Sequence, residues 1–541
     1  MTDLARSSRR ALPVLDVAAA PSATARPIAP VPADERLAEY RPEAPALPRF
    51  HVWTLGCQMN RSDSEEMAGR LMAAGCAEAP AIESADLIVI NSCAIREAAE
   101  QKVIGRQGQL ARLKAANPGL RIVLTGCSVR EADRAGLRRR YPAVDLFLRP
   151  DEEPELVDRL GLASAQGAVG LVGATTTVGR AVVGVADHLS RTRAAAVAAG
   201  AVSRDSATSA WLPIIYGCDK TCTYCIVPFS RGPERSRPFD EIVAEARSIA
   251  AAGYREVTLL GQNVNSYGHD LAAEARFGHV ASERWAGRRL DLHGRPDLAE
   301  LIRAIDAIRT ADGQPAIERL RFVTSHPWDL SDRLIAAMAD CPSVCEHLHL
   351  PVQSGDDAVL RRMGRQYTIE HYLERLARIR EAVPGIAIST DVIVGFCGET
   401  EDQFRSTLRL LETVGYDQVF AAAYSERPGT PATRLADDVP PEVKRRRLNE
   451  LLALQEAIGR ERNRAWLGRD VEVLVDAVTP PRAHDHDEAG EGALPIPRVS
   501  GRTRQNKLVH LAGGPELLGS PVRVRVDHAG PYALRGTVVG A

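Results

Sequence analysis

Three cysteines in a single loop have the spacing C-x3-C-x2-C. They are Cys218, Cys222 and Cys225, in the segment GCDKTCTYCIVP. A zinc site needs a fourth ligand, usually from a second cysteine pair or a histidine at regular spacing, and the sequence offers no clear candidate. Iron–sulfur clusters usually take four thiolates, so a [4Fe-4S] cluster held by three leaves one iron open. An open metal position can bind a substrate or cofactor, and this loop therefore predicts a catalytic cluster.

A second set of three cysteines is spread along the first part of the chain. Cys57, Cys93 and Cys127 close the apolar runs HVWTLGC, IVINSC and RIVLTGC, with separations of 36 and 34 residues, each about one βα repeat. Because chemistry gathers at the carboxyl ends of parallel strands, we expect these thiols to share one sheet edge and a second [4Fe-4S] cluster. Buried structural thiols are the alternative, but core cysteines would be scattered along the strands.

Composition and the absence of membrane or signal segments predict that these cysteines are in a reducing compartment. The chain has 541 residues, a net charge of -2 and 45% hydrophobic residues, which suggests three or four domains at roughly 150 residues each. No apolar run is long enough to span a bilayer, and the N-terminus lacks the pattern of a secretory signal. We therefore expect a cytoplasmic protein without membrane association, in which the ten cysteines are ligands or core residues rather than disulfides.

The pattern of strands and helices positions both sets of cysteines in an α/β fold. Residues 1–46 predict a disordered tail, and 47–160 predict an N-terminal domain with a parallel sheet covered on both faces. The low-complexity segment 161–205 is interpreted as a linker or insertion. Six strand–helix units within 206–465 predict a partial, TIM-like (β/α)6 barrel. Short alternating strands in 466–541 predict a small C-terminal β-barrel.

Single helices, one loop and two further cysteines can also be assigned from the sequence. The segment SDSEEMAGRLMAAG predicts a helix capped by Ser62 or Asp63, and REAAEQKVIGRQGQLARLKAA predicts one continuous second helix. Residues 270–292 are interpreted as an extra loop in the barrel. Cys341 and Cys345 are expected in the core.

Longer motifs identify a family. C-x3-C-x2-C with an aromatic residue at Tyr224 resembles the radical S-adenosylmethionine superfamily. Residues 49–540 resemble the methylthiotransferases of this superfamily. Their N-terminal domain is resembled by TLGCQMNRSDSE, INSCAIRE and LTGC, and their RNA-binding β-barrel, called TRAM, by GRTRQNKLVH and LRGTVV. Their central barrel is resembled by SRGPERSRP, LLGQNVNSYG, TSHP, HLPVQSGDDAVLRRMGRQYT and STDVIVGFCGETEDQF. GQNVNSYG and YSERPGTPA look most like the branch that modifies isopentenylated adenosine in tRNA. Cys397 departs from the pattern, because proline is expected there.

The resemblance implies a radical methylthiotransferase with two [4Fe-4S] clusters and S-adenosylmethionine as methyl donor and radical source. The cluster on Cys218, Cys222 and Cys225 would cleave the cofactor, and the second cluster would supply the sulfur. The methylthio group would enter at C2 of N6-isopentenyladenosine next to the anticodon, where the C–H bond is too weakly acidic for a protein base. A low-potential flavodoxin or ferredoxin would be the reductant, and the chain is taken to be a monomer.

Other functions remain open. The same chemistry could act on threonylcarbamoyl-adenosine in tRNA or on a ribosomal protein aspartate. A non-catalytic iron–sulfur carrier, an RNA-binding scaffold and a structural zinc protein are alternatives of another class, although none of them needs two open-iron clusters.

Further cofactor contacts are assigned to residues near the ends of barrel strands. Gly261 and Gln262 would approach the methionine amino group, and Gly395 would flank the adenine. The ribose or carboxylate would be contacted by Ser325, Gln353 and Ser354. Beyond the cluster loop, Arg231, Arg235 and Arg237 could pair with a carboxylate or phosphate.

Two basic segments are candidates for RNA binding, since local positive charge can follow phosphates. A run from Lys444 to Arg447 lies on a predicted helix over 440–466, where charge usually marks a solvated face. The stronger candidate is in the C-terminal β-barrel, where residues 498–525 carry six cations against the single acid Glu516. These cations are Arg498, Arg502, Arg504, Lys507, Arg523 and Arg525.

Overall fold

The computed structural model describes residues 48–94, 97–130, 134–162, 202–278, 283–285, 288–290, 293–479 and 498–540. The predicted tail over 1–46 and nearly all of the predicted linker over 161–205 lie outside these residues. Within the described ranges, no helix has both the length and the apolar content that crossing a membrane requires.

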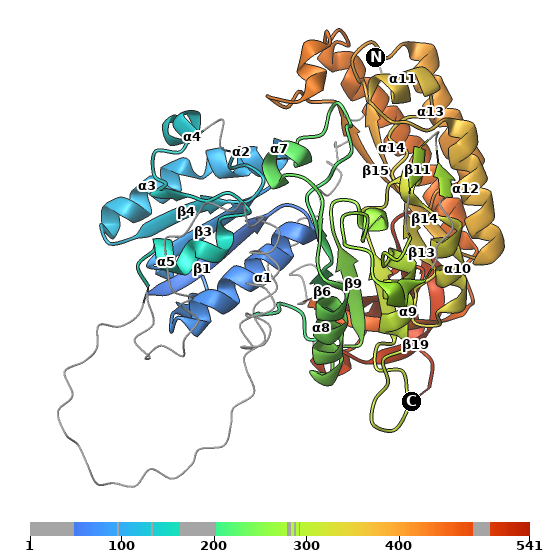
Figure 1. Cartoon of the computed structure of the whole chain (residues 1–541), viewed down its shortest axis with the longest axis horizontal. Coiled ribbons are helices and arrows are strands. Elements are labelled where there is room, and N and C mark those ends of the chain that lie inside the picture. Colours follow the sequence, from blue (N-terminus) through green and yellow to red (C-terminus); the bar gives the residue numbers. More distant parts are fainter. Residues whose placement is uncertain are drawn as a thin grey trace, which may run out of the picture. The chain divides into compact units, whose positions relative to one another are not determined.

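A five-stranded parallel sheet forms the first folded region (Figure 1). Its interior strands are apolar on both faces, because alternate residues pack into two separate cores. This confirms the predicted sheet with two covered faces. In sheet order the strands are β2 (Ala77–Glu78), β1 (Arg49–Leu55), β3 (Leu87–Ser92), β4 (Arg121–Thr125) and β5 (Leu146–Phe147).

Helices cover the two faces of this sheet, with α1 on one side and α2 and α3 on the other (Figure 1). The predicted continuous helix was wrong, because the chain breaks at Arg106, directly after Gly105. Glycine costs a helix about 1 kcal/mol relative to alanine, which favours a break there. The helices are α1 (Gln58–Ala73), α2 (Glu97–Gly105), α3 (Gln107–Ala116), α4 (Arg134–Arg140) and α5 (Leu156–Arg159).

Six parallel strands in chain order form the second region, as the strand–helix alternation predicted. They make two three-stranded sheets, joined by a parallel bridge between Leu320 and Val344. The strands are β6 (Ser209–Pro213), β9 (Glu256–Leu260), β12 (Arg319–Phe322), β13 (His347–His349), β14 (Ala387–Val394) and β15 (Gln418–Ala423). The helices are α8 (Phe239–Ala251), α9 (Leu298–Asp306), α10 (Asp332–Asp340), α11 (Asp357–Arg362), α12 (Ile369–Ala382) and α13 (Glu401–Val414).

Helix α14 (Pro441–Arg464) packs against β15 and leads to a closed five-stranded barrel. Valine side chains fill the interior of this barrel, which confirms the predicted small C-terminal β-barrel. Its strands, in the order in which they pair, are β16 (Asp470–Thr479), β17 (Arg498–Arg502), β18 (Leu508–Ala512), β20 (Ala533–Val538) and β19 (Pro521–Ala529).

Buried polar contacts fix the small barrel to the amino ends of the large barrel's strands. Arg321 of β12 donates a hydrogen bond to the carbonyl oxygen of Thr503 at 2.8 Å. Arg504 donates to the Glu346 carboxylate, just before β13, at 2.9 Å and to the Val344 carbonyl oxygen at 2.6 Å. Arginine can satisfy several acceptors at once from one planar group, and this suits it to such an interface.

Replacing Arg504 with alanine is expected to lower the free energy of unfolding by about 2 kcal/mol, because the Glu346 carboxylate and strand-end carbonyls lose their donor. The measurement is urea unfolding of the full chain. Arg523→Ala, at an exposed position on β19, is the matched control and should change stability by no more than about 0.5 kcal/mol. Equal unfolding midpoints for the two variants would contradict the interface role of Arg504.

Candidate active site

The three cysteines of the first region lie at one edge of the parallel sheet. Cys57 follows β1, Cys93 follows β3 and Cys127 comes two residues after β4, and β3 lies between the other two strands. The strand register pairs Leu55 with Ser92, so neighbouring strands end level with each other. Cys93 and Cys127 are buried and Cys57 is half-buried. The spacing of about one βα repeat thus brings the three thiols to one edge, as expected.

Helix α1 begins directly after Cys57, so the prediction of a cap at Ser62 or Asp63 was wrong. Cys57 has the extended backbone of an N-cap residue, with φ -91° and ψ 179°, and the two polar residues lie inside the helix. The pKa of Cys57 is lowered to about 6, chiefly by a hydrogen bond with the Cys93 side chain. Burial opposes this, and the Arg231 charge and two N–H groups of the first helical turn lower the pKa further.

The other three cysteines lie in the loop between β7 (Ile215–Tyr216) and helix α7 (Val227–Arg231). Cys218 and Cys222 are buried, and Cys225 is half-buried. The Cys225 N–H donates to the Cys222 carbonyl oxygen at 3.1 Å. Burial raises the pKa of Cys225 to about 12 and also raises that of Cys218. The loop therefore gathers three sulfurs where water is largely excluded.

A buried arginine joins this loop to the large barrel. Arg365 donates from Nη1 to the Cys222 sulfur at 3.4 Å and from Nη2 to the Pro351 carbonyl oxygen at 2.7 Å. Tyr224, between the second and third cysteines, packs edge-on against Phe396, with ring centroids 6.4 Å apart. Aromatic packing and a charged hydrogen bond thus hold the loop at the carboxyl ends of the strands.

Gly217, immediately before Cys218, sets the direction of the cluster loop. Its φ is +72°, and a Cβ there would lie 2.0 Å from the Pro233 carbonyl oxygen. Gly217→Ala is expected to cost at least about 2 kcal/mol in the free energy of unfolding, from backbone strain and the clash. Chemical denaturation measures it. Gly253 also has a positive φ, +88°, but a Cβ there would meet nothing within 4 Å. Gly253→Ala therefore measures the backbone strain alone. An equal loss of unfolding free energy in the two variants would show that the clash at Gly217 contributes nothing.

The two sets of cysteines meet. Ile226, next to Cys225, packs with Cys127 and Ala94 in one small apolar cluster. The two thiols are close enough that charge on Cys127 raises the pKa of Cys225. The sheet edge of the first region and the loop of the second therefore form one site.

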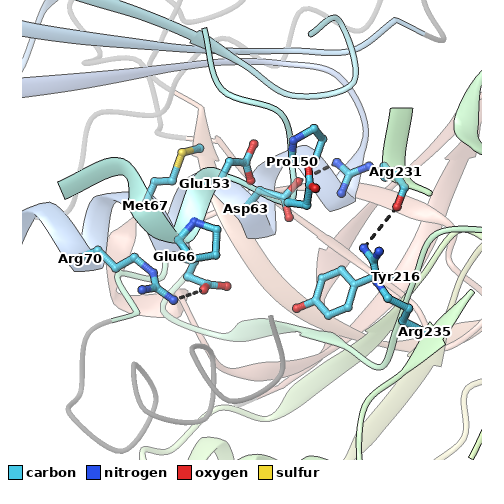
Figure 2. Close-up of a pocket in the computed structure, with 11 residues that line it drawn as sticks. Asp63, Glu66, Met67, Arg70, Pro150, Glu153, Tyr216, Arg231 and Arg235 are labelled. Atoms are coloured by element: carbon cyan, nitrogen blue, oxygen red, sulfur yellow. Dashed lines mark hydrogen bonds and ion pairs between the residues drawn. The ribbon is translucent and has the colours of Figure 1, made fainter. Parts of the chain in front are cut away.

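Arg231 connects the same two regions and lines a pocket together with Asp63, Glu153 and Tyr216. It is 6% exposed, forms an ion pair with Asp63 at 2.6 Å and donates from Nε to the Cys127 sulfur at 3.1 Å. Figure 2 shows the Arg231 guanidinium directed toward Asp63, with Glu153 nearby. Glu153 accepts a hydrogen bond from the Thr125 hydroxyl at 2.7 Å. Burial, reinforced by the Asp63 charge, holds the Glu153 pKa well above its ordinary value.

The donor sets fit iron–sulfur clusters better than single ions. Among the described residues, no group of three or more His, Cys, Asp or Glu is arranged to hold one metal ion. A [4Fe-4S] cluster makes a different demand, since its three protein sulfurs bind three different irons and need not converge on one point. Each set also has an arginine that donates to one sulfur, Arg231 to Cys127 and Arg365 to Cys222. Such donors and charges stabilise clusters in proteins.

Polar groups without partners lie at the carboxyl ends of the large barrel's strands. The side-chain oxygens of Gln262, after β9, and Ser325, after β12, are buried without a hydrogen-bond partner. Thr324 and Gln353 both have φ of 70°, a backbone strain that clusters at functional sites. Ser354 is fully buried. Unsatisfied donors and acceptors at this end suit a polar ligand.

The two glycines among the predicted cofactor contacts are required by packing. A Cβ on Gly261 would lie 2.4 Å from the Ile215 side chain, and one on Gly395 would lie 2.4 Å from Lys444. The face of Gly395 on which a Cβ would lie is therefore packed against helix α14. Its N–H donates to the Glu399 carboxylate at 2.6 Å.

Comparison with known proteins identifies the family. Residues 212–411 match the radical SAM superfamily, and 49–149 match a family described as the uncharacterized protein family UPF0004. A tRNA-2-methylthio-N(6)-dimethylallyladenosine synthase from Acetivibrio thermocellus is 40% identical over 90% of this chain and 90% of its own length. A relative of the same name from Roseiflexus is 39% identical over 94% of this chain and 93% of its own. The chain belongs to this synthase family.

A solved structure aligns with much of this chain. A radical S-adenosylmethionine methyltransferase from Kitasatospora setae aligns over 71% of this chain and 77% of its own, at 14% identity and a TM-score of 0.47. Membership of the radical SAM superfamily itself entails a [4Fe-4S] cluster and S-adenosylmethionine.

In this family member, half of the predicted RNA-binding cations of the small barrel serve other purposes. Arg504 and Lys507 contact the large barrel, and Lys507 pairs with Asp417 at 2.8 Å. Arg502 is half-buried and donates to the Asn506 carbonyl oxygen. The other three, Arg498, Arg523 and Arg525, are exposed, and Arg525 pairs with Asp470 of the same barrel.

The basic run on α14 also faces internal acids. Lys444 pairs with Asp437 at 2.6 Å, and Arg447 pairs with Glu399 at 2.9 Å. Of the arginines after the cluster loop, Arg237 is fully buried against Glu245. These partners belong to the chain itself and could not be assigned from charge alone.

Sequence reasoning missed the site roles of Asp63, Glu153 and Arg365. Asp63 was interpreted as a helix cap, and Arg365 lies in the motif MGRQYT, which was used for the resemblance without a role. Glu153 lies in an acidic run, DEEPE, of the kind that is normally solvated. For Asp63 and Arg365 the available signal was a position within a quoted motif, but only the fold shows which face is buried.

Proposed function

We propose that the chain methylthiolates C2 of N6-isopentenyladenosine in tRNA, next to the anticodon. One cluster would be held by Cys218, Cys222 and Cys225, and a second, sulfur-delivering cluster by Cys57, Cys93 and Cys127. The observation that carries this proposal is the meeting of the two sets of cysteines around Ile226 and Cys127. Transfer of a sulfur group to a carbon radical requires that the two centres serve one substrate atom.

Each part of the site has a defined task. The first cluster with S-adenosylmethionine supplies the one-electron chemistry that removes an unactivated hydrogen. Gln262, Ser325 and Gln353 would bind polar groups of the cofactor, and Tyr224 and Arg365 would hold the cluster loop in place. The burial of the cysteines excludes water, which protects a reactive site from side reactions.

The relatives favour this substrate over the two alternatives. Each relative described above is named for dimethylallyladenosine in tRNA, not for threonylcarbamoyl-adenosine or a ribosomal protein. We further propose that the enzyme acts in the cytoplasm as a monomer, with a low-potential flavodoxin or ferredoxin as reductant.

Phosphate contacts are proposed for the exposed arginines of the small barrel. Arg523→Ala is expected to weaken tRNA binding several-fold and to reduce the slope of log affinity against log salt by about 1, because one phosphate contact is lost. Filter binding across a salt series measures both quantities. Arg504→Ala, which acts at the interface, is the comparison: an unchanged slope for both variants would place the RNA elsewhere.

The decisive experiment is the analysis of tRNA nucleosides from cells that lack this chain. If the proposal holds, 2-methylthio-N6-isopentenyladenosine disappears and the unthiolated isopentenyl nucleoside accumulates in the mass spectrum. The wild-type chain should restore the methylthio group. Unchanged nucleosides in a cell without a second such enzyme would rule out this substrate, and ribosomal proteins would then be examined.

A further inference from the structure

Arg231 is the last residue of helix α7, which follows the cluster loop, but it contacts a cysteine of the first region. Its Nε donates to the Cys127 sulfur at 3.1 Å, and its Nη2 lies 2.6 Å from Asp63 of α1. Both Arg231 and Cys127 are buried, at 6% and 1% exposure. A buried charge is costly unless it is paired, so an arginine held here indicates strong compensating interactions.

The surroundings of Arg231 are dominated by groups that carry or can carry negative charge. The Asp63 carboxylate and the Cys127 sulfur contact its guanidinium, and Glu153 lines the same pocket. Helix α7 thus places one permanent cation against the sheet edge at which the three thiols of the first region lie.

We propose that Arg231 is a positioning residue for the second cluster and that it sets the reduction potential of that cluster. The thiols of the first region would then have a charged partner from α7, the helix that follows the cluster loop. This inference rests on the proposed function, because it takes Cys57, Cys93 and Cys127 as ligands of a second cluster.

The sign of the effect follows from electrostatics. A reduced cluster carries one more negative charge than an oxidised one, so a nearby N–H donor and cation favour reduction. Removing the Arg231 charge should lower the potential. Asp63 partly neutralises that charge, so removing the Asp63 carboxylate should raise the potential. A purely structural ion pair has no reason to give opposite shifts.

The test uses the full chain with Cys218, Cys222 and Cys225 replaced by alanine, so that only the second cluster contributes. Arg231→Gln, Arg231→Lys and Asp63→Asn are compared after anaerobic reconstitution, with iron content, electron paramagnetic resonance and a spectroelectrochemical titration as readouts. Arg235→Gln is the matched control. Arg235 donates to the Arg231 carbonyl oxygen at 3.3 Å, and within the described residues its side chain makes no hydrogen bond to a cysteine.

Arg231→Gln is expected to lower the ratio of reduced to oxidised cluster at least tenfold at a fixed applied potential, which equals about 59 mV for one electron. Arg231→Lys should recover part of this loss, Asp63→Asn should shift the ratio in the opposite direction, and Arg235→Gln should leave it unchanged. If Arg231→Gln loses its iron while Arg231→Lys keeps it, the charge is required for binding, which also supports the proposal.

Three results count against the inference. Bound cluster with an unchanged potential in Arg231→Gln and Asp63→Asn overturns it and leaves the proposed function intact. Loss of iron in both Arg231 variants, with no positive shift in Asp63→Asn, also overturns it. The third result is a chain with Cys218, Cys222 and Cys225 replaced and Arg231 intact that binds no iron. It would show that Cys57, Cys93 and Cys127 hold no cluster. The proposed function would then lose its second cluster, and this inference would fail with it.

Discussion

Cys222→Ala is expected to abolish both reductive cleavage of S-adenosylmethionine and methylthiolation of tRNA. The reason is the loss of one of three thiolates from a cluster that has no spare protein ligand. Turnover should fall on the order of a thousandfold or more, and bound iron should fall by about four atoms per chain. The measurements are 5′-deoxyadenosine release under reduction, nucleoside analysis and iron content.

Cys341→Ala is the control for this substitution. Cys341 is buried in the large barrel's core and is not part of either set. Its replacement should cost about 1 kcal/mol of stability and leave iron and activity unchanged. If Cys222→Ala retained 5′-deoxyadenosine formation, or if Cys341→Ala lost iron to the same extent, the assignment of the cluster ligands would be wrong.

Cys127→Ala is expected to separate the two halves of the reaction. Release of 5′-deoxyadenosine should continue, because the first cluster keeps its ligands, while the methylthio nucleoside should fall to background. Iron content should again fall by about four atoms per chain. The same three measurements apply, and the contrast with Cys222→Ala lies in the cleavage of the cofactor.

Cys76 provides the comparison within the first region. It is buried in the core on the α1 side of the sheet, so Cys76→Ala should affect stability but not iron. Methylthio product from the Cys127→Ala variant would refute sulfur delivery by a cluster on the sheet edge. Loss of both products would show that the two sites cannot be separated, because Cys127 also packs against the cluster loop.

Much of the fold could be predicted because its signals are local and repeated. Apolar strands of five to seven residues between helices predicted a parallel sheet covered on both faces, and the cores on the two faces confirm it. The placement of Cys57, Cys93 and Cys127 followed from the same regularity. Each closes one strand–helix unit, and parallel strands end at the same edge.

The contacts between regions could not be predicted, because they depend on which surfaces meet. Arg231 and Arg504 look alike in the sequence, as arginines in basic motifs, yet one contacts Asp63 and the other Glu346. The start of α1 was missed for a different reason. Ser62 and Asp63 are common capping residues, but the strand ends at Leu55 and the helix begins three residues later.

Helix α14 fixes the separation between the catalytic end of the large barrel and the small barrel. Near its start, Lys444 lies beside Gly395 at the catalytic end of the large barrel, and near its end Asn463 donates to the Gly530 carbonyl oxygen of the small barrel. These two positions are 19 residues apart, or about 28 Å along a helix. The helix is continuous, so it holds the two ends at a fixed separation. An RNA that contacted both ends would have to bridge that length.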